Sequence, residues 1–525
     1  MSLIRKSGVV LLLVLFSLPA LLAPRNFPTD DSLFYLQVAR HIASGHGSTF
    51  DSISVTNGYH PLWMAPCVAA AWLSGGDPTV MLRIVFLMQQ WLAVGALWLF
   101  HRLALRLGIR SWAVGVPLVA IFLLTGLYAS EAHLNGFCIL ASLLLLVRLA
   151  EEPTSWNGAR LGACLGATVL ARLDSVLLVG AILAGGAIWI ASRAPRRLRA
   201  LGVAMVPMSL IVAPYLLWNL ATFGHLMPIS GAIKTTFPRI YGDLRNLGVL
   251  GLSTFAIALM GGVGLLFKSV APRRRLVLGS MVVGVVAHAL YITLYTDHNT
   301  HWSWYYVPGV LLAALLACVA ADELETRFSR LTTRSLAVVA IALLVMWGLA
   351  RVWARFANSR ATSHNQFLFR ILAPARAPRW EVQFAQHLEH ALPPQASVLA
   401  FDYPGALAFY SSLRVIPADG LIGGYAYDTE VREKGLAAYV AAHNVGYYFG
   451  ELTEPSDSCR AEAIFAPIER TDVGSIILCP QNLVATSGQV VRDVPAPTVG
   501  LYRIRDVAPP QNAPRERMKK HGLLW

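Results

Sequence analysis

The sequence predicts a polytopic α-helical membrane protein of about eleven transmembrane helices, with interfacial helices in its first outward loop. A small C-terminal α/β domain is predicted to follow outside the cytoplasm. Hydrophobic residues make up 56% of the 525, charged residues make up 14%, and the mean hydropathy is +0.54. Apolar segments of membrane-spanning length recur up to residue 354, and the composition is globular afterwards. We therefore divide the chain into a membrane module, 1–354, and a soluble domain, 355–525.

The first apolar segment follows Arg5 and Lys6 and ends near Ala23. It lacks a clear small-residue cleavage site, so we interpret it as a retained span rather than a signal peptide. Residues 61–74 are apolar but short, and we assign them to the first loop. The ten other predicted spans centre on 78–101, 111–129, 132–149, 159–172, 175–192, 201–219, 249–267, 276–295, 305–321 and 335–354.

Lysine and arginine are distributed unequally between the two sides that these spans define. One set of connections carries eighteen of these residues and the other carries six. Positive charge is retained on the cytoplasmic side of membrane proteins, so the poorer set and the soluble domain are predicted to face outward. The bias accounts for most of the net charge of +14, so no nucleic-acid partner is predicted. The six outward residues are Arg25, Arg40, Arg172, Lys234, Arg239 and Arg245.

The first outward loop, Asp30–Trp63, is the densest cluster of polar and aromatic side chains before residue 220. Asp30 and Asp31 begin a predicted amphipathic helix that ends near Gly45 and lies flat in the membrane interface. Asn57-Gly58 then predicts a tight turn. The polar face of the helix contains Gln37, Arg40, His41 and Ser44, and its apolar face contains Phe34, Val38 and Ile42.

Asp30 and Asp31 admit two interpretations. Either residue can cap the helix, which is a common duty of aspartate. Capping needs only one carboxylate, however, and it does not explain the Asn, His, Tyr and Trp residues that follow in the loop. We therefore expect one of the two carboxylates to be functional.

Later outward loops contain further candidates. Glu131 lies in a very short connection, where an unpaired carboxylate at membrane depth is costly and usually functional, although a solvated turn is the alternative. Arg172 and Asp174 form either a plain interfacial ion pair or a phosphate ligand oriented by a carboxylate. Lys234 is the one lysine of the longest outward loop in the membrane module.

His298 and His301 are three residues apart, a spacing that suits metal ligation, but no third ligand lies nearby in the sequence. A divalent metal ion therefore stays open as a cofactor. The Trp and Tyr residues around them suit an interfacial aromatic belt, and we favour an aromatic wall for a sugar ring or lipid headgroup. The cytoplasmic connections contain no phosphate loop or dinucleotide fingerprint, so we predict no nucleotide site.

The predicted soluble domain alternates strands and helices. Strands are expected at Val398–Phe401, Arg414–Ile416, Val445–Phe449, Ser475–Cys479 and within Val490–Arg503, with a helix at Ala406–Tyr410. Cys459 and Cys479 lie in this outward region, where an oxidising compartment allows a disulfide.

Several of these segments resemble the glycosyltransferase-C superfamily of integral-membrane enzymes that use polyprenyl-phosphate sugars. The bacterial branch related to protein mannosyltransferases and aminoarabinose transferases is the most similar, over most of the membrane module. Asp402…Gly405…Asp419-Gly420-Leu421 also looks like the C-terminal domain of that branch. The resemblance is carried by Asp-Asp…Gly-His-Gly…Asn-Gly-Tyr-His-Pro-Leu-Trp in the first loop, Glu131, Arg172-Leu-Asp174, Phe223-Gly224…Pro228…Lys234 and Trp304-Tyr-Tyr-x-Pro308.

This resemblance implies an inverting transfer of a monosaccharide from a polyprenyl-phosphate donor to an acceptor hydroxyl, at the outer face of a bacterial inner membrane. Asp30 or Asp31 is then the catalytic carboxylate, with a slight preference for Asp30. Implied partners are the donor, a lipid, glycan or protein acceptor, and membrane lipids. The implied substrate-binding residues are Arg172 and Lys234 for the phosphate, with His225 or His298, and also Tyr59, His60, Glu131, Asp174, His301 and Tyr305.

The residues suit this chemistry independently. An inverting transfer needs a carboxylate to accept the acceptor proton and cationic groups for the departing phosphate. The alternatives are a lipid-linked glycan ligase or polymerase, for which we expect more outward arginines, and a polyprenyl-lipid transporter. A transporter is expected to have repeated halves and ionisable residues at mid-membrane, and the sequence shows neither.

Overall fold

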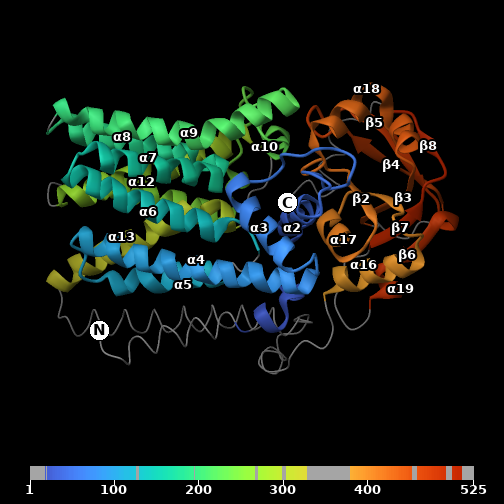
Figure 1. Cartoon of the computed structure of the whole chain (residues 1–525), viewed down its shortest axis with the longest axis horizontal. Helices are drawn as coiled ribbons and strands as arrows, with labels where there is room; N and C mark the ends of the chain where they lie inside the picture. Colours follow the sequence, from blue (N-terminus) through green and yellow to red (C-terminus); the bar gives the residue numbers. More distant parts are fainter. Residues whose placement is uncertain are drawn as a thin grey trace.

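The computed structural model describes residues 18, 20–125, 129–193, 195–265, 270–297, 303–327, 379–451, 458–491 and 499–510. A helical bundle and a globular C-terminal domain lie at opposite ends of the long axis, with the first loop between them (Figure 1). Most of the first predicted span, and all of the last at 335–354, lie outside the described residues.

The bundle consists of long helices that run side by side (Figure 1). Seven of its helices in the described ranges, some extended by a 3-10 turn, are long and apolar enough to cross a membrane, while α5 and α7 are shorter. Nine of the predicted spans therefore correspond to helices. They are α4 (Pro78–Arg106), α5 (Gly115–Thr125), α6 (Ala132–Glu151), α7 (Ser155–Ala171), α8 (Val176–Ala191), α9 (Leu198–Phe223), α11 (Gly248–Leu265), α12 (Pro272–Tyr295) and α13 (Val307–Arg327), with 3-10 turns η2 (Trp112–Val114), η3 (Leu173–Ser175), η4 (Pro195–Arg197), η5 (Leu244–Leu247) and η6 (Ser303–Tyr306).

Ion pairs join the basic connections at the end of the bundle away from the domain. Glu151 pairs with Arg106 at 2.5 Å and with Arg273 at 2.9 Å. Arg274 pairs with Asp322 at 3.0 Å. The connections predicted to be cytoplasmic thus meet at one end, and the loops predicted to face outward meet the C-terminal domain at the other.

The first loop contains η1 (Pro24–Asn26), α2 (Asp30–Ala43) and α3 (Pro61–Leu73). The acidic pair in the first turn of α2 suits the positive end of the helix dipole. The helix ends as predicted: Gly45 has φ +83°, its amide donates to Ile42, and the His46 amide donates to His41, which is a Schellman cap. No hydrogen-bonded turn is assigned at Asn57-Gly58, and Gly58 packs against Leu421 and Ile422 of the C-terminal domain.

α2 is the amphipathic helix predicted for the first outward loop, and protein packs against two of its sides. α2 is amphipathic, but it is covered by α3 on one side and by helix α17 (Pro404–Tyr410) of the C-terminal domain on another. Its polar residues are used in these contacts: Gln37 is buried, and Arg40 donates to the Phe409 carbonyl at 2.9 Å. Gln37 and Arg40 thus meet protein groups, whereas Ser44 at the end of the polar face is exposed.

The C-terminal domain is α/β, as predicted. Its main sheet has the order β2-β1-β3-β7-β6, with β1, β2 and β3 parallel and β7 and β6 antiparallel. A second sheet, β4-β5-β8, was not predicted from the sequence. Cys459 and Cys479 form a disulfide at its edge. The elements are α16 (Trp380–Ala391), β1 (Ser397–Ala400), α17, β2 (Arg414–Pro417), α18 (Gly424–Ala442), β3 (Val445–Glu451), β4 (Arg460–Phe465), β5 (Asp472–Leu478), η8 (Pro480–Asn482), β6 (Leu483–Thr486), α19 (Ser487–Val490), β7 (Val499–Arg503) and β8 (Val507–Ala508).

Glycines allow the domain to approach the first loop closely. A Cβ on Gly405 would lie 2.4 Å from the Asp30 carbonyl oxygen, and one on Gly58 would lie 2.4 Å from that of Leu421. Even the single methyl group of alanine does not fit at either contact. An ion pair of Arg470 with Asp297, just after α12, also joins the C-terminal domain to the bundle.

Candidate functional site

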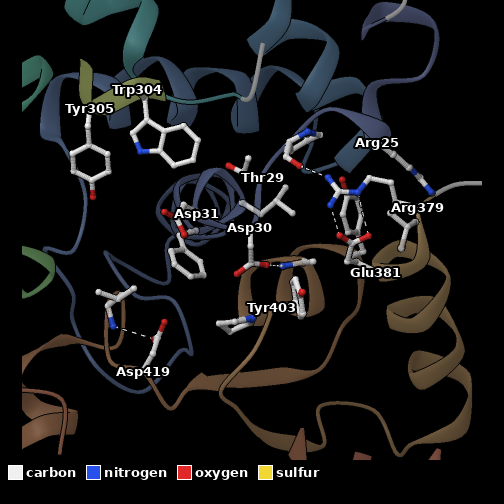
Figure 2. A pocket seen from close by; sticks show the side chains of 18 of the residues that line it. Arg25, Thr29, Asp30, Asp31, Trp304, Tyr305, Arg379, Glu381, Tyr403 and Asp419 are labelled. Carbon is white, nitrogen blue, oxygen red and sulfur yellow. Dashed lines mark hydrogen bonds and ion pairs between the residues drawn. The ribbon is translucent and has the colours of Figure 1, made fainter. Parts of the chain in front are cut away.

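Two cavities lie where the bundle, the first loop and the C-terminal domain meet. The larger has a volume of about 140 Å³ and the smaller about 70 Å³. Figure 2 shows the larger cavity. We call the side chains that line both cavities the junction between the cavities. These shared residues are Asp31, Phe34, Lys234, Trp304, Tyr305 and Leu421.

Asp30 holds the C-terminal domain rather than its own helix. One carboxylate oxygen accepts the Ala406 amide at 2.7 Å and the other accepts the Gly405 amide at 3.2 Å (Figure 2). Asp30 thereby caps the N-terminus of α17, where backbone N–H groups lack helical partners. Burial raises the pKa of Asp30 well above its usual range. The two amide hydrogen bonds lower this pKa in part, and the neighbouring Asp31 carboxylate raises it further.

Asp31 occupies the next position on α2 and points to a different side. Its carboxylate makes no hydrogen bond to any residue that the structure describes, and it faces both cavities. Burial raises the pKa of the Asp31 carboxyl, while the ammonium of Lys234 lowers it and Glu131 raises it. A half-buried carboxylate of raised basicity is thus available to a bound molecule.

Lys234 is the last residue of α10 (Ile229–Lys234). Its ammonium donates to the Tyr305 phenol oxygen at 3.1 Å, and no carboxylate of the described residues lies within ion-pair distance. Burial opposes its positive charge, but Tyr305 and Asp31 more than offset this and raise the pKa of Lys234. Lys234 and Asp31 therefore line the same junction, and the charged ammonium of Lys234 has no carboxylate of the described residues in contact.

Arg172 belongs to a buried network of ion pairs. Its guanidinium pairs with Glu131 and, at 2.9 Å, with Asp174, and His288 lies 3.3 Å from the Asp174 carboxylate. Glu131 is 3% exposed, so its interpretation as a solvated turn residue is wrong. The guanidinium carbon also lies 4.3 Å from the centre of the Tyr305 ring. Arg172 thus forms the predicted ion pair with Asp174, and it also supports the tyrosine to which Lys234 donates.

His60 lines the smaller cavity, whereas Tyr59 lines neither one. The His60 Nδ1 accepts the Leu173 amide, and Nε2 lies 3.9 Å from Glu131. Burial lowers the pKa of His60 to about 4, so the ring is neutral with its proton on Nε2. The Tyr59 hydroxyl hydrogen-bonds Ser48 at 2.7 Å and stabilises the loop instead.

The remaining histidine candidates do not join this cluster. His225 is exposed and stacks on Tyr425 of the C-terminal domain, with 4.3 Å between the ring centres. His298 and His301 lie outside the described residues. Within the described ranges, no group of three His, Cys, Asp or Glu side chains is arranged to hold a metal ion.

Two groups of cavity residues were not assigned to the site from the sequence. Asp419 reaches the larger cavity from the turn after β2, and burial raises its pKa to about 7. Arg25 and the ion pair of Arg379 with Glu381 line another part of the same cavity (Figure 2). The Asp419-Gly420 turn was visible in the sequence, but nothing local indicates that it faces the membrane module.

No protein-family model and no curated protein sequence matches the chain. Solved structures do match. ArnT from Cupriavidus metallidurans, in the apo state, is 15% identical to this chain, with a TM-score of 0.55. The match covers 90% of this chain and 98% of the ArnT chain. The same protein bound to undecaprenyl phosphate is 14% identical with a TM-score of 0.55, over 84% of this chain and 94% of that chain.

A mycobacterial arabinofuranosyltransferase, AftD, is 15% identical with a TM-score of 0.45, over 96% of this chain and 42% of that chain. At these identities the likeness to ArnT concerns the fold, and it extends through both the membrane bundle and the C-terminal domain. The chain therefore has the fold of ArnT, which agrees with the resemblance of its first loop to the glycosyltransferase-C superfamily.

Proposed function

We propose that this protein is a membrane glycosyltransferase that moves a monosaccharide from a polyprenyl-phosphate donor to an acceptor hydroxyl, with inversion. Asp31 acts as the general base, and Lys234 binds the phosphate. The observation that carries the proposal is the junction of the two cavities, where a carboxylate without a hydrogen-bond partner among the described residues faces a lysine without a carboxylate in contact.

The chemistry requires these two groups. In an inverting transfer the acceptor oxygen attacks the anomeric carbon from the side opposite the phosphate, and a base removes its proton. The departing phosphate gains charge, which a fixed ammonium stabilises. Lys234 suits that role because its raised pKa keeps it charged at neutral pH.

Asp31 is favoured over Asp30 as the base because of their partners. Both oxygens of Asp30 already accept amide hydrogen bonds, so proton transfer from an acceptor hydroxyl to Asp30 would compete with the cap of α17. Asp31 carries no such bond and lines both cavities. This reverses the slight preference for Asp30 that the sequence resemblance implied.

Two cavities suit two substrates that meet at one carboxylate. The acceptor class is a lipid, glycan or protein hydroxyl, and the donor is a lipid phosphate. Support for the lipid comes from the fold shared with ArnT, for which a structure bound to undecaprenyl phosphate exists. Positive-charge bias favours the outer face of a bacterial inner membrane as the location of the reaction.

The test compares Asp31→Asn with Asp30→Asn in purified, full-length protein. Asn cannot accept a proton as a carboxylate does, so Asp31→Asn is expected to lower turnover at least 100-fold. Binding of undecaprenyl phosphate should persist. Asp30→Asn retains a carbonyl oxygen for the Ala406 amide and should stay within about tenfold of the wild type. Near-normal transfer by Asp31→Asn would refute the assignment.

A further inference from the structure

The turn that carries Asp419 is held rigidly against the site. Its flanking residue Ala418 donates to Ala400 at 2.8 Å, which extends the pairing of β2 with β1. One carboxylate oxygen of Asp419 accepts the Leu421 amide at 3.1 Å. Gly420 has φ +70°, and a Cβ there would lie 2.3 Å from Pro467, so a side chain is excluded. The backbone therefore determines where the Asp419 carboxylate points.

The second oxygen of Asp419 is not satisfied by the described parts of the protein. The residue is only 8% exposed, yet its Oδ2 makes no hydrogen bond to them and its side chain faces the larger cavity (Figure 2). A carboxylate oxygen that opens into a cavity and has no protein partner accepts hydrogen bonds from water or from a ligand there. This oxygen is therefore an acceptor that the cavity offers to its occupant.

The surroundings of Asp419 indicate what kind of group would donate. Trp304 and Tyr305 line the same cavity from the bundle side, and Leu421 continues the turn on the domain side. Asp419 also interacts electrostatically with both Asp31 and Lys234. An aromatic wall opposite a carboxylate suits a sugar, because the ring carbons pack on the aromatic face while the hydroxyls donate to the carboxylate.

We propose that Asp419 binds hydroxyl groups of the sugar carried by the donor, which makes the C-terminal domain part of the donor-binding site. The inference rests on the proposed function and deepens it. In this arrangement Lys234 holds the phosphate, and Asp419 recognises the glycosyl unit attached to it. Discrimination among sugars then depends on a residue of the domain rather than on the membrane helices alone.

Asp419→Asn isolates the second oxygen. The amide keeps its carbonyl for the Leu421 N–H, so the turn is retained, but a donor group replaces the open acceptor. Asp472→Asn is a matched control, because Asp472 accepts the Gly474 amide two residues on, in the same domain and outside both cavities. Both variants are compared with the wild type as full-length protein in lipid nanodiscs.

The probes are undecaprenyl phosphate without a sugar and a panel of undecaprenyl-phosphoryl pentoses and hexoses. For the preferred sugar lipid of the panel, the sugar contribution is the ratio of its affinity to that of the bare lipid. At pH 8.5, above the raised pKa of Asp419, Asp419→Asn is expected to lower this ratio about 10- to 100-fold, as for a hydrogen bond to a charged group, with bare-lipid affinity within twofold. Asp472→Asn should change neither affinity.

The outcomes separate this inference from the function on which it rests. An unchanged ratio in Asp419→Asn, while the wild type still transfers sugar, overturns the inference alone. So does an equal loss of affinity for both lipids, or a rise confined to the acceptor KM. A wild-type protein that binds no sugar lipid better than the bare lipid overturns both.

Discussion

The Asp30 carboxylate accepts the backbone N–H of Ala406 at 2.7 Å, across 376 positions of the sequence. The first residue of α2 thereby caps a helix of the C-terminal domain. Asp31 follows about 100° further around α2 and faces the junction of the cavities. Two adjacent carboxylates thus have separate partners, and this separation can be tested residue by residue.

Removal of the Asp30 carboxylate should loosen the domain without removing the base. In Asp30→Ala the amides of Gly405 and Ala406 lose their acceptor, and buried unpaired amides cost about 1–3 kcal/mol each. We expect a lower thermal midpoint and faster protease cleavage between bundle and domain. Asp30→Asn should be milder in both assays. Identical behaviour of Asp30→Ala and the wild type would show that the contact is unimportant.

Donor binding should depend on Lys234 and, to a lesser degree, on Tyr305. A hydrogen bond to a charged group contributes about 1.5–3 kcal/mol, so Lys234→Ala should weaken binding of the lipid phosphate about 10- to 100-fold. Tyr305→Phe keeps the ring against Arg172 but removes the acceptor of the Lys234 N–H, so we expect about tenfold or less. The measurement is the dissociation constant for undecaprenyl phosphate.

Lys434→Ala is the control for this prediction, because Lys434 forms an exposed pair with Glu430 on α18, away from both cavities. It should bind the lipid phosphate like the wild type. Lys234→Ala with wild-type affinity would exclude Lys234 from the phosphate site.

Turnover should fall on acidification at a higher pH than an ordinary aspartate would require. The base acts only when deprotonated, and burial raises the pKa of Asp31. Activity is therefore present above that raised pKa and is lost as the pH falls through it, above the usual value near 4. The check is kcat against pH at saturating donor. Asp419→Asn should keep this acid limb, whereas a constant kcat from pH 8 down to pH 4 contradicts the assignment.

The soluble domain should lie outside the cytoplasm. Basic connections meet at the far end of the bundle, where Arg106 and Arg273 both pair with Glu151, and positive charge is retained on the cytoplasmic side. Alkaline phosphatase fused after residue 510 should be active, and a fluorescent protein there should be dark. A fluorescent protein inserted after Gly108 should be bright. The opposite pattern would move every proposed site residue to the cytoplasmic side.

The disulfide between Cys459 and Cys479 should stabilise the domain. A loop of this length is worth about 3 kcal/mol in the chain-entropy account. Cys459→Ser, Cys479→Ser and the double variant should lose similar stability, because each breaks the same bond. Differential scanning calorimetry measures the loss, and non-reducing mass spectrometry of the wild type should find the two cysteines linked.

Much of the bundle was predictable because a membrane span depends on local hydropathy. α7, for example, falls on the span predicted at 159–172, although it is only 17 residues long. The polar surface of α2 was predictable as well, but its environment was not. Arg40 has the same polarity whether it faces water or the Phe409 carbonyl, so only the docked domain distinguishes the two.

The site was predictable in part for the same reason. The resemblance to a known superfamily assigned residues of four separate loops to one site: Asp31, Glu131, Arg172 and Lys234. The choice between Asp30 and Asp31 depends on which side of α2 meets α17, a contact that is remote in sequence. Asp419 belongs to a turn that looks ordinary by itself, and His225 lines neither cavity but stacks on Tyr425.

The contact between α2 and α17 also orders events during synthesis. Asp30 leaves the ribosome 376 residues before Ala406, an interval of about 20 to 75 seconds at roughly 5–20 residues per second. Throughout that time the cavity lacks the wall that Tyr403, Ala406, Asp419 and Leu421 later supply. A nascent or truncated chain can thus insert its helices and still hold no complete pocket. The pocket is complete only after the C-terminal domain has folded against the first loop.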